Sequence, residues 1–290
     1  MKTTRGPRIL VFDSGVGGLS VADCIHRQLP GLDLVYLADN AGFPYGDKPE
    51  AEVVERCTRL IASALGVYAP DVIVVACNTA STVVLPHLRA MTSVPVVGVV
   101  PAIKPAAAKT VNRRIGLLAT PATVRRPYID RLIEEFASDC LIERIGHPGL
   151  VSWAERLVAG HAVPEGELTE AMAPFRSAAV DTVVLGCTHY PLLLESLRKS
   201  LPGVRFWVDS GEAIARRVAW LLAEAGLAVP GADVHPDDAL AGEKTAVLAA
   251  LFSGPAPEGI APFMAGLGLL PAQVAGNWPA EPGVRAAGSA

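Results

Sequence analysis

Cys77 and Cys187 are the residues whose type and surroundings best suit chemistry. Each ends a short apolar run and is followed at once by polar residues, in Cys77-Asn78-Thr79-Ala80-Ser81 and in Gly186-Cys187-Thr188-His189-Tyr190-Pro191. A lone cysteine at a strand end is usually a small buried hydrophobic residue. Two at matching positions, each opening a helix whose N-terminus favours the thiolate, instead indicate reactive thiols with pKa values lowered toward neutrality.

Such a pair of cysteines has three chemical uses: a redox disulfide, a covalent nucleophile, or a paired acid and base. A disulfide is disfavoured if a substrate must fit between the two sulfurs. A nucleophile predicts one cysteine with a neighbouring base, not two cysteines in equivalent positions. The residues alone leave the three uses open.

The remaining cysteines, Cys24, Cys57 and Cys140, lie in helix-like stretches without polar neighbours, and we expect them to fill the core. Five cysteines are an odd number, and no Cys-x-x-Cys pair occurs. This pattern indicates neither a disulfide framework nor a zinc site, and it favours a reducing cytoplasm.

A glycine-rich loop, Asp13-Ser14-Gly15-Val16-Gly17-Gly18-Leu19-Ser20, follows the first strand-like run. It lacks the third glycine of a dinucleotide fingerprint and the Gly-Lys-Ser/Thr ending of a P-loop, so a nucleotide cofactor is disfavoured. Two interpretations remain: a tight turn between strand and helix, or a loop whose N–H groups approach an anionic ligand. In the second interpretation Asp13 points outward from a strand end, beside the Ser14 hydroxyl.

Two further features adjoin predicted strand ends. In Pro44-Tyr45-Gly46, proline and glycine bracket a tyrosine, a pattern that by itself is more often a structural turn than a site. Of the six histidines, His189 alone adjoins a candidate reactive residue.

Short apolar runs without alternation predict strands that are buried on both faces, as in a parallel sheet covered by helices. The expected strands are Arg8–Asp13, Leu32–Asp39, Asp71–Cys77, Val94–Val100, Arg114–Thr120, Asp181–Cys187 and Val204–Asp209, with Leu141–His147 as a further candidate. Helical spacing of apolar residues occurs between them, as in Glu50–Tyr68, Thr123–Ala137 and Gly166–Ala179. The alternation predicts an α/β fold.

The chain also contains an internal repeat. The run Asp71–Cys77 resembles Asp181–Cys187, 110 residues later, and the run beginning at Arg8 resembles the one beginning at Arg114, 106 residues later. We therefore predict two similar domains, each a mostly parallel sheet flanked by helices. Chemistry collects beyond the carboxyl ends of parallel strands, so the two cysteines are expected to meet across one cleft between the domains.

The composition excludes several classes of protein. Lys and Arg number 25 against 29 Asp and Glu, a net charge of −4 that argues against nucleic acid as a partner. No apolar run reaches the roughly 18–20 residues of a membrane span, and the N-terminus lacks a signal-peptide cleavage site. The length of 290 residues favours two packed units.

The C-terminal stretch, residues 253–290, is rich in Pro, Gly and Ala. Its apolar patches Ile260–Met264 and Leu267–Leu270 are expected to dock partly on the body. The residues after Gln273 are expected to form a disordered tail.

Four motifs, in order along the chain, together resemble bacterial glutamate racemases of the aspartate/glutamate racemase superfamily. They are Asp13-Ser14-Gly15-Val16-Gly17-Gly18-Leu19, Pro44-Tyr45-Gly46, Cys77-Asn78-Thr79-Ala80 and Gly186-Cys187-Thr188-His189-Tyr190-Pro191. The resemblance extends from about Ile9 to Leu227 and includes Val208-Asp209-Ser210-Gly211.

The resemblance implies a cofactor-independent isomerase that interconverts L- and D-glutamate and supplies D-glutamate for peptidoglycan. It also implies two α/β domains, the second inserted in the first, with the substrate between them. We expect a discontinuous first domain of residues 1–97 and 209–252, a second domain of residues 98–208, and the tail of residues 253–290. No cofactor and no metal is expected, and nothing suggests pyridoxal phosphate.

The resemblance further implies that Cys77 and Cys187 are the acid/base residues on opposite faces of the substrate α-carbon. Cys77 would deprotonate D-glutamate, and Cys187 would deprotonate L-glutamate. The physical chemistry agrees, since inversion by proton transfer needs one group of similar acidity on each side of a planar intermediate.

By the same resemblance, the substrate contacts are Asp13, Ser14, Tyr45, Gly46, Asn78, Thr79, Thr188 and His189. Asp13 and His189 would also tune the thiols. Glu155 is expected as a supporting acid, because the segment from His147 to Glu155 matches a family Cys-Pro-aromatic-Val stretch, although it departs at several positions. Thr120 is a further candidate contact.

Three alternatives to glutamate racemisation remain. The chain could act on aspartate or hydantoin within the same superfamily, be a non-catalytic regulatory binding protein on this fold, or be a thiol redox enzyme. The two cysteines with their polar neighbours argue against lost catalysis. The expected partner is the substrate glutamate, with neither nucleic acid nor membrane, and a homodimer is plausible for the family.

Overall fold

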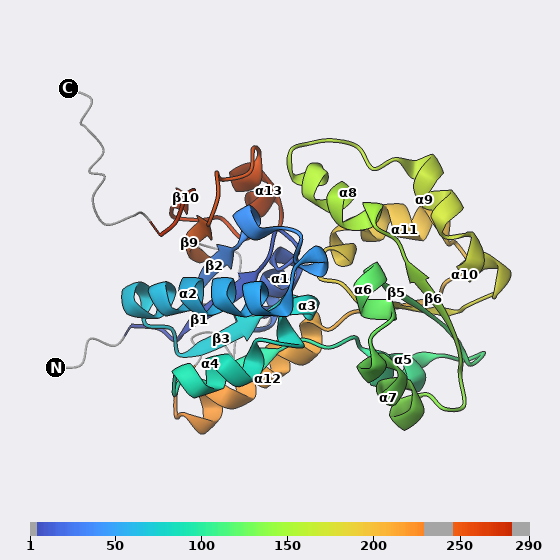
Figure 1. Ribbon diagram of the computed structural model, residues 1–290, viewed down its shortest axis with the longest axis horizontal. Helices are drawn as coiled ribbons and strands as arrows, with labels where there is room; N and C mark the ends of the chain where they lie inside the picture. Colours follow the sequence, from blue (N-terminus) through green and yellow to red (C-terminus); the bar gives the residue numbers. More distant parts are fainter. Residues whose placement is uncertain (1–4, 229–245, 280–290) are drawn as a thin grey trace.

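A computed structural model describes residues 5–228 and 246–279, and two parallel β-sheets organise them (Figure 1). The first sheet has the strand order β10-β9-β2-β1-β3-β4, with every neighbouring pair parallel. Its strands are β1 (Arg8–Asp13), β2 (Asp33–Ala38), β3 (Val72–Val75), β4 (Val96–Gly98), β9 (Val247–Phe252) and β10 (Val274–Ala275). The central strands are apolar throughout because helices cover both faces.

Successive residues of β1 belong to opposite cores, with Ile9 and Val11 in one layer and Leu10 and Phe12 in the other. The first layer contains α1 (Leu19–Gln28), α12 (Gly211–Glu224) and α13 (Ile260–Gly266). The second contains α2 (Glu50–Tyr68) and α4 (Leu85–Met91). The one-turn helix α3 (Asn78–Ser81) and the 3-10 helices η1 (Asn40–Gly42) and η2 (Tyr45–Asp47) lie in loops after the strands.

The second sheet has the order β6-β5-β7-β8, again entirely parallel. Its strands are β5 (Arg114–Ala119), β6 (Leu141–Gly146), β7 (Thr182–Leu185) and β8 (Phe206–Val208). One face is covered by α5 (Ile103–Lys109) and α7 (Pro127–Phe136), and the other by α8 (Gly149–Val158), α9 (Glu165–Ala171), α10 (Ala173–Ser177) and α11 (Leu194–Ser200). The short α6 (Pro121–Val124) and η3 (Tyr190–Leu193) follow β5 and β7. Among the helices of residues 5–228 and 246–279, none has both the length and the apolar character that crossing a bilayer requires.

The internal repeat in the sequence corresponds to a repeated topology. The order β2-β1-β3-β4 in the first sheet matches β6-β5-β7-β8 in the second. The Ala76 N–H donates to the Phe12 carbonyl at 2.7 Å, and the Gly186 N–H donates to the Leu118 carbonyl at 2.7 Å. The cysteines that follow Ala76 and Gly186 therefore occupy equivalent places, and the predicted α/β class with two helix-flanked parallel sheets is confirmed.

The strands of the first sheet lie on both sides of the second sheet along the sequence. Strands β1 to β4 precede β5, and β9 and β10 follow β8. The long helix α12, which also follows β8, packs on α1. These features support the division that we propose, in which residues 98–208 are inserted between residues 1–97 and 209–252.

The structure differs from the sequence prediction in the C-terminal stretch. The predicted strands omit β9, a buried strand beside β2. The expectation of disorder after Gln273 is wrong for residues 274–279, since β10 pairs with β9 and the Trp278 N–H donates to the Phe252 carbonyl. The open edge of β9 offers the hydrogen-bonding groups that order this segment. The expected docking of Ile260–Met264 is confirmed, and the tail residues 280–290 lie outside the described residues.

Candidate active site

Residues that follow β1, β3, β5 and β7 line one cavity of about 170 Å³ between the two sheets. Both cysteines and every predicted substrate contact belong to its wall, as does the further candidate Thr120. The wall therefore includes Asp13, Ser14, Tyr45, Gly46, Cys77, Asn78, Thr79, Cys187, Thr188 and His189. Glu155 lies outside the wall and reaches the site through His189.

Cys77 directly precedes α3 and is 6% exposed. Its sulfur lies 3.7 Å from the Ser14 hydroxyl. Burial raises the pKa of the Cys77 thiol well above its ordinary value, and the charge of nearby Asp13 raises it further. The Ala80 N–H in α3 does lower this pKa, as a helix N-terminus should, but the removal of the thiol from water outweighs it. The expectation of a pKa lowered toward neutrality is therefore wrong for Cys77.

Cys187 has a cationic neighbour. Its sulfur lies 3.7 Å from His189 Nδ1, and His189 Nε2 lies 2.6 Å from Glu155 Oε1. Burial favours the neutral imidazole, but the hydrogen bonds with Cys187 and Glu155 outweigh it and raise the pKa of His189 well above its ordinary value. The protonated ring places a positive charge beside the Cys187 sulfur.

The buried carboxyl group of Asp13 connects the two halves of the site. The Thr188 hydroxyl donates to Asp13 Oδ2 at 2.9 Å, and the Ser14 N–H donates to Asp13 Oδ1 at 2.6 Å. Burial raises the pKa of Asp13, and the charge of His189 partly offsets this effect. Asp13 thus fixes the residue beside each cysteine: Ser14 near Cys77, and Thr188 next to Cys187 in the chain.

The glycine-rich loop after β1 contacts Glu155 and His189, which belong to the half that contains the second sheet. The Val16 N–H donates to Glu155 Oε1 at 2.8 Å. A side chain on Gly17 would collide with the His189 ring, and one on Gly15 with the Glu155 carboxylate. The loop thus donates an N–H group to a carboxylate of the protein itself, Glu155, and its approach to an anionic ligand stays a prediction.

Tyr45 lines the cavity, but its hydroxyl is engaged behind the wall. The hydroxyl donates to Asp39 Oδ2 at 2.6 Å and accepts from the Cys57 thiol at 3.5 Å. Neither Asp39 nor Cys57 belongs to the cavity wall. Tyr45 therefore contributes to the cavity wall while its hydroxyl is engaged elsewhere, and the neighbouring Gly46 has open space beside its α-carbon.

Asn78 carries a buried acceptor without a partner. Its Oδ1 has no hydrogen-bond donor among the described residues, and the residue lines the cavity. A buried polar atom left unpaired costs free energy, so such an atom suits a ligand that brings its own donor. The ammonium group of an amino acid is such a donor.

Several residues of the cavity wall were not predicted as contacts from the sequence, although Pro44 belongs to a motif that was noted. They are Phe43, Pro44, Asp47, Pro121, Ala122, Thr123, Arg125, Pro148, Val151 and Ser152. Phe43 could have been found, because it adjoins the Pro44-Tyr45-Gly46 motif; its ring centroid is 5.8 Å from that of His189. Thr123 and Arg125 carry no such signal. They reach the cleft because α6 packs against η2, the 3-10 helix that follows β2 in the other half.

The known proteins to which this chain is similar point to one family. The sequence model of the Asp/Glu/hydantoin racemase family matches residues 9–218. The glutamate racemase of Proteus mirabilis is 50% identical over 224 residues, which cover 76% of this chain and 78% of that relative. The glutamate racemase of Klebsiella pneumoniae is 52% identical over 218 residues, covering 74% and 77%.

The structure is similar to that of Escherichia coli glutamate racemase in complex with L-glutamate and the activator UDP-MurNAc-Ala. The TM-score is 0.82 at 43% identity, over 94% of this chain and 99% of that one. A glutamate racemase isoform from Bacillus anthracis gives a TM-score of 0.74 at 28% identity, over 93% and 96% of the chains. The resemblance drawn from the motifs is confirmed, and the chain belongs to the Asp/Glu/hydantoin racemase family.

Proposed function

We propose that the chain interconverts L- and D-glutamate without a cofactor, using Cys77 and Cys187 as the two acid/base residues, and so supplies D-glutamate for peptidoglycan. The observation that carries the proposal is that two free thiols, at equivalent strand ends of two similar sheets, line one cavity. Relatives named glutamate racemase, at 50% and 43% identity, support glutamate as the substrate.

In the L-to-D direction, the Cys187 thiolate removes the α-proton of L-glutamate and becomes a thiol. The Cys77 thiol then donates its proton to the opposite face of the planar carbanion and becomes a thiolate. The reverse reaction exchanges these roles. One proton leaves the substrate and one returns, no electron is transferred, and solvent exchange resets the two thiols.

The surroundings of the thiols suit these roles. The α-proton of an amino acid is weakly acidic, so the carbanion needs positioned donors and the exclusion of water. The raised pKa keeps Cys77 as a thiol, ready to donate. The His189 imidazolium, held by Glu155, is a counterion for a Cys187 thiolate. Asn78 Oδ1 is free to accept from the substrate ammonium group.

The alternatives have less support. Racemases of aspartate or hydantoin belong to the matched family, but the Escherichia coli structure at 43% identity contains L-glutamate. The polar contacts of both thiols, with Ser14 and with His189, weigh against a purely regulatory protein. A cytoplasmic location and a homodimer are parts of the proposal that rest on the resemblance.

The test is α-proton exchange in D2O with purified protein and no added cofactor. We expect both glutamate enantiomers to racemise and gain deuterium at the α-carbon, and both aspartate enantiomers to remain unchanged. Cys77→Ala and Cys187→Ala should each lower racemisation by about a thousandfold or more, because each removes one of two required acid/base groups.

The single variants also test the assignment of each cysteine to one enantiomer. Cys187→Ala keeps Cys77 and should exchange the α-proton of D-glutamate alone, with retention of configuration, while Cys77→Ala should do so with L-glutamate alone. The opposite pattern would reverse the assignment. Absence of exchange with every amino acid would favour the regulatory protein, and ready formation of a Cys77–Cys187 disulfide would favour the redox enzyme.

A further inference from the structure

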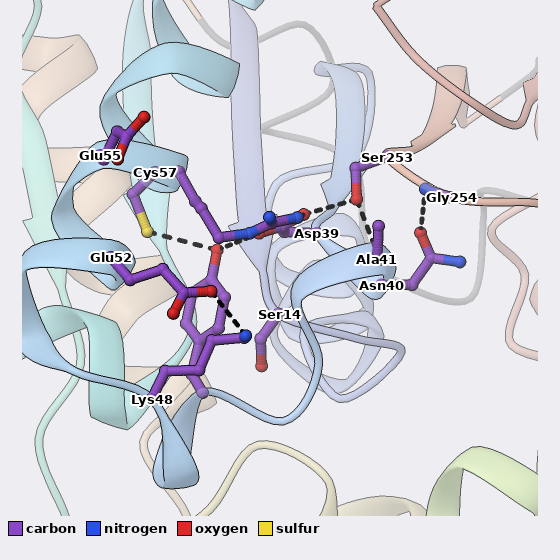
Figure 2. A network of polar contacts seen from close by, with 12 residues as sticks. Ser14, Asp39, Asn40, Ala41, Lys48, Glu52, Glu55, Cys57, Ser253 and Gly254 are labelled. Carbon is purple, nitrogen blue, oxygen red and sulfur yellow. Dashed lines mark hydrogen bonds and ion pairs between the residues drawn. The ribbon is translucent and has the colours of Figure 1, made fainter.

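A buried carboxylate lies behind the loop Phe43–Asp47, which we call the substrate loop. Asp39 directly follows β2, is fully buried and does not line the cavity. Arg56 donates to it twice, from Nε to Oδ2 at 2.6 Å and from Nη2 to Oδ1 at 2.8 Å. The Tyr45 and Ser253 hydroxyls donate to Oδ2 and Oδ1 respectively, so all four donor atoms converge on one side chain. Figure 2 shows the bond between Ser253 and Asp39.

This arrangement keeps Asp39 ionised. Burial would raise the pKa of Asp39, but the hydrogen bonds from Arg56, Ser253 and Tyr45 outweigh it and hold the pKa below its ordinary value. Charge-assisted and bidentate bonds are the strong class of hydrogen bond in proteins. The carboxylate therefore acts as a fixed anchor for the groups that surround it.

One of these groups comes from the far end of the chain. Ser253 follows β9, outside the residues 9–218 that match the family. Its Oγ also accepts from the Ala41 N–H at 3.0 Å, and the Gly254 N–H donates to Asn40 Oδ1 at 2.8 Å (Figure 2). Asn40 Nδ2 in turn donates to the Pro255 carbonyl at 2.7 Å. The segment that leads into the substrate loop is thus bound along one side to residues 253–255.

The backbone passes directly over the ion pair. A side chain on Gly42 would collide with the Arg56 guanidinium and the Asp39 carboxylate. From there the chain continues through Phe43 and Pro44 to Tyr45 and Gly46, in the wall of the cavity. A shift of the Asp39–Arg56 pair would therefore move the substrate loop.

We propose that Asp39 is a positioning residue for the racemase reaction: with Arg56 and Ser253 it fixes the substrate loop, so that the C-terminal segment takes part in substrate binding. This inference rests on the proposed function and deepens it. A loop held in its bound conformation loses less conformational freedom when a ligand binds. Loosening the loop should weaken the binding of glutamate while leaving the two thiols and His189 in place.

The experiment compares Asp39→Asn, Ser253→Ala and Tyr45→Phe with the control Asp33→Asn. Asp33 begins the strand that Asp39 follows, and it pairs with Arg8 at 3.3 Å, at the end of the sheet away from the cavity. We expect Asp39→Asn to raise the KM for glutamate by about tenfold or more in both directions, and Ser253→Ala and Tyr45→Phe by about threefold, with kcat within about twofold. Asp33→Asn should keep the wild-type KM.

A double variant separates positioning from a general loss of stability. If Ser253 acts through Asp39, adding Ser253→Ala to Asp39→Asn should raise the KM no further, whereas independent effects would multiply. A further threefold rise would overturn the proposal. So would an unchanged KM in both Ser253→Ala and Tyr45→Phe. Each of these variants loses its hydrogen bond to Asp39 and one to a further neighbour, Ala41 or Cys57, and the two decide the matter even if Asp39→Asn does not fold.

The wild-type measurement distinguishes a failure of the proposed function from a failure of the positioning role of Asp39. A wild-type protein that does not racemise glutamate would remove the proposed function, and this inference with it. An active wild type whose KM is shared by Asp39→Asn and Ser253→Ala would remove the positioning role alone.

Discussion

The two thiols of the cleft have different electrostatic surroundings. Burial and Asp13 raise the pKa of Cys77, whereas Cys187 faces His189, whose pKa is raised by Cys187 and Glu155 against the effect of burial. This difference should make the two forms of the free enzyme, which in the proposed mechanism bind L- and D-glutamate, unequal in free energy. Two enantiomers have equal free energies, so kcat/KM must be the same in both directions. The asymmetry should therefore appear in kcat and KM separately.

Glu155→Gln tests the role of this charge at the residue scale. The amide oxygen can still accept from the Val16 N–H, but the negative charge beside His189 is lost. Because the His189 pKa is raised, the wild-type imidazolium persists at neutral pH and is lost as the pH rises through that pKa. The variant should lose it at lower pH, shifting the alkaline limb of kcat/KM down by roughly one pH unit or more.

The matched control for this profile is Glu195→Gln, which removes an exposed carboxylate paired with Lys199 on α11. Its pH profile should coincide with that of the wild type. An alkaline limb that stays in place in Glu155→Gln would show that His189 does not depend on Glu155 for its charge.

Among the secondary-structure elements, the loop between β1 and α1 is shaped by two side chains of the second half, His189 and Glu155. His189 and Glu155 come so close that residues 15 and 17 have no room for side chains. The glycines thus allow the loop after β1 to contact two parts of the second half, the segment after β7 that contains His189 and the helix α8 that contains Glu155.

Gly17→Ala should therefore push the His189 ring away from Cys187. We expect kcat/KM to fall by about a hundredfold, within the range of contributions made by acid/base groups, and the thermal midpoint to fall as well. Gly66→Ala is the control, because Gly66 lies in α2 with open space around its α-carbon. That variant should keep full activity and gain about 0.5–1 kcal/mol of stability from helix propensity. Equal activity of the two variants would contradict the contact.

Sequence patterns predicted the elements that are marked by buried β-branched runs. Asp71–Cys77 and Asp181–Cys187 contain β3 and β7, and Glu50–Tyr68 coincides with α2. Strand β9 was not predicted, because its residues, Val-Leu-Ala-Ala-Leu-Phe, include one β-branched side chain and equally suit a buried helix. Its partner β2 lies more than two hundred residues earlier, and no local pattern reveals such a pairing.

The site was predictable only where motif residues themselves face the cavity. Both cysteines, Asn78 and Thr188 do so. The anchor behind Tyr45 was missed because residues 39, 56 and 253 come together only in the folded chain, and none lies in a chemically distinctive run. Local propensity determines the helices and strands, whereas contacts behind the cavity wall depend on how helices and strands from distant parts of the sequence pack.

At the scale of the whole molecule, the cleft is closed by contacts of two kinds. Inside, the bond between Thr188 and Asp13 is buried. At the rim, Arg126 of the second half pairs with Glu50 of the first at 3.2 Å, with side chains 29% and 67% exposed. Cys77 and Cys187 are only 6% and 8% exposed. We therefore expect that a substrate reaches them when these halves separate.

Separation breaks the Arg126–Glu50 pair, so this pair should slow the entry of any thiol reagent. An exposed ion pair contributes about 0–1 kcal/mol, so Arg126→Gln should speed labelling of Cys77 and Cys187 by up to about fivefold at low salt. The difference should vanish in about 0.5 M NaCl, where the wild-type pair is screened. Mass spectrometry resolves each site, with the partly exposed Cys140 as an internal reference whose rate should not change.

Arg144→Gln is the matched control, since Arg144 pairs with Asp130 inside the second half, at exposures of 32% and 62%. Equal acceleration by both variants would mean that loss of surface charge, rather than opening of the cleft, governs labelling. Acceleration confined to Arg126→Gln, and suppressed by glutamate, would identify one motion that both admits the substrate and exposes the two thiols. The same closure that removes water from the carbanion would then also set the rate of entry, because the buried and exposed contacts must separate together.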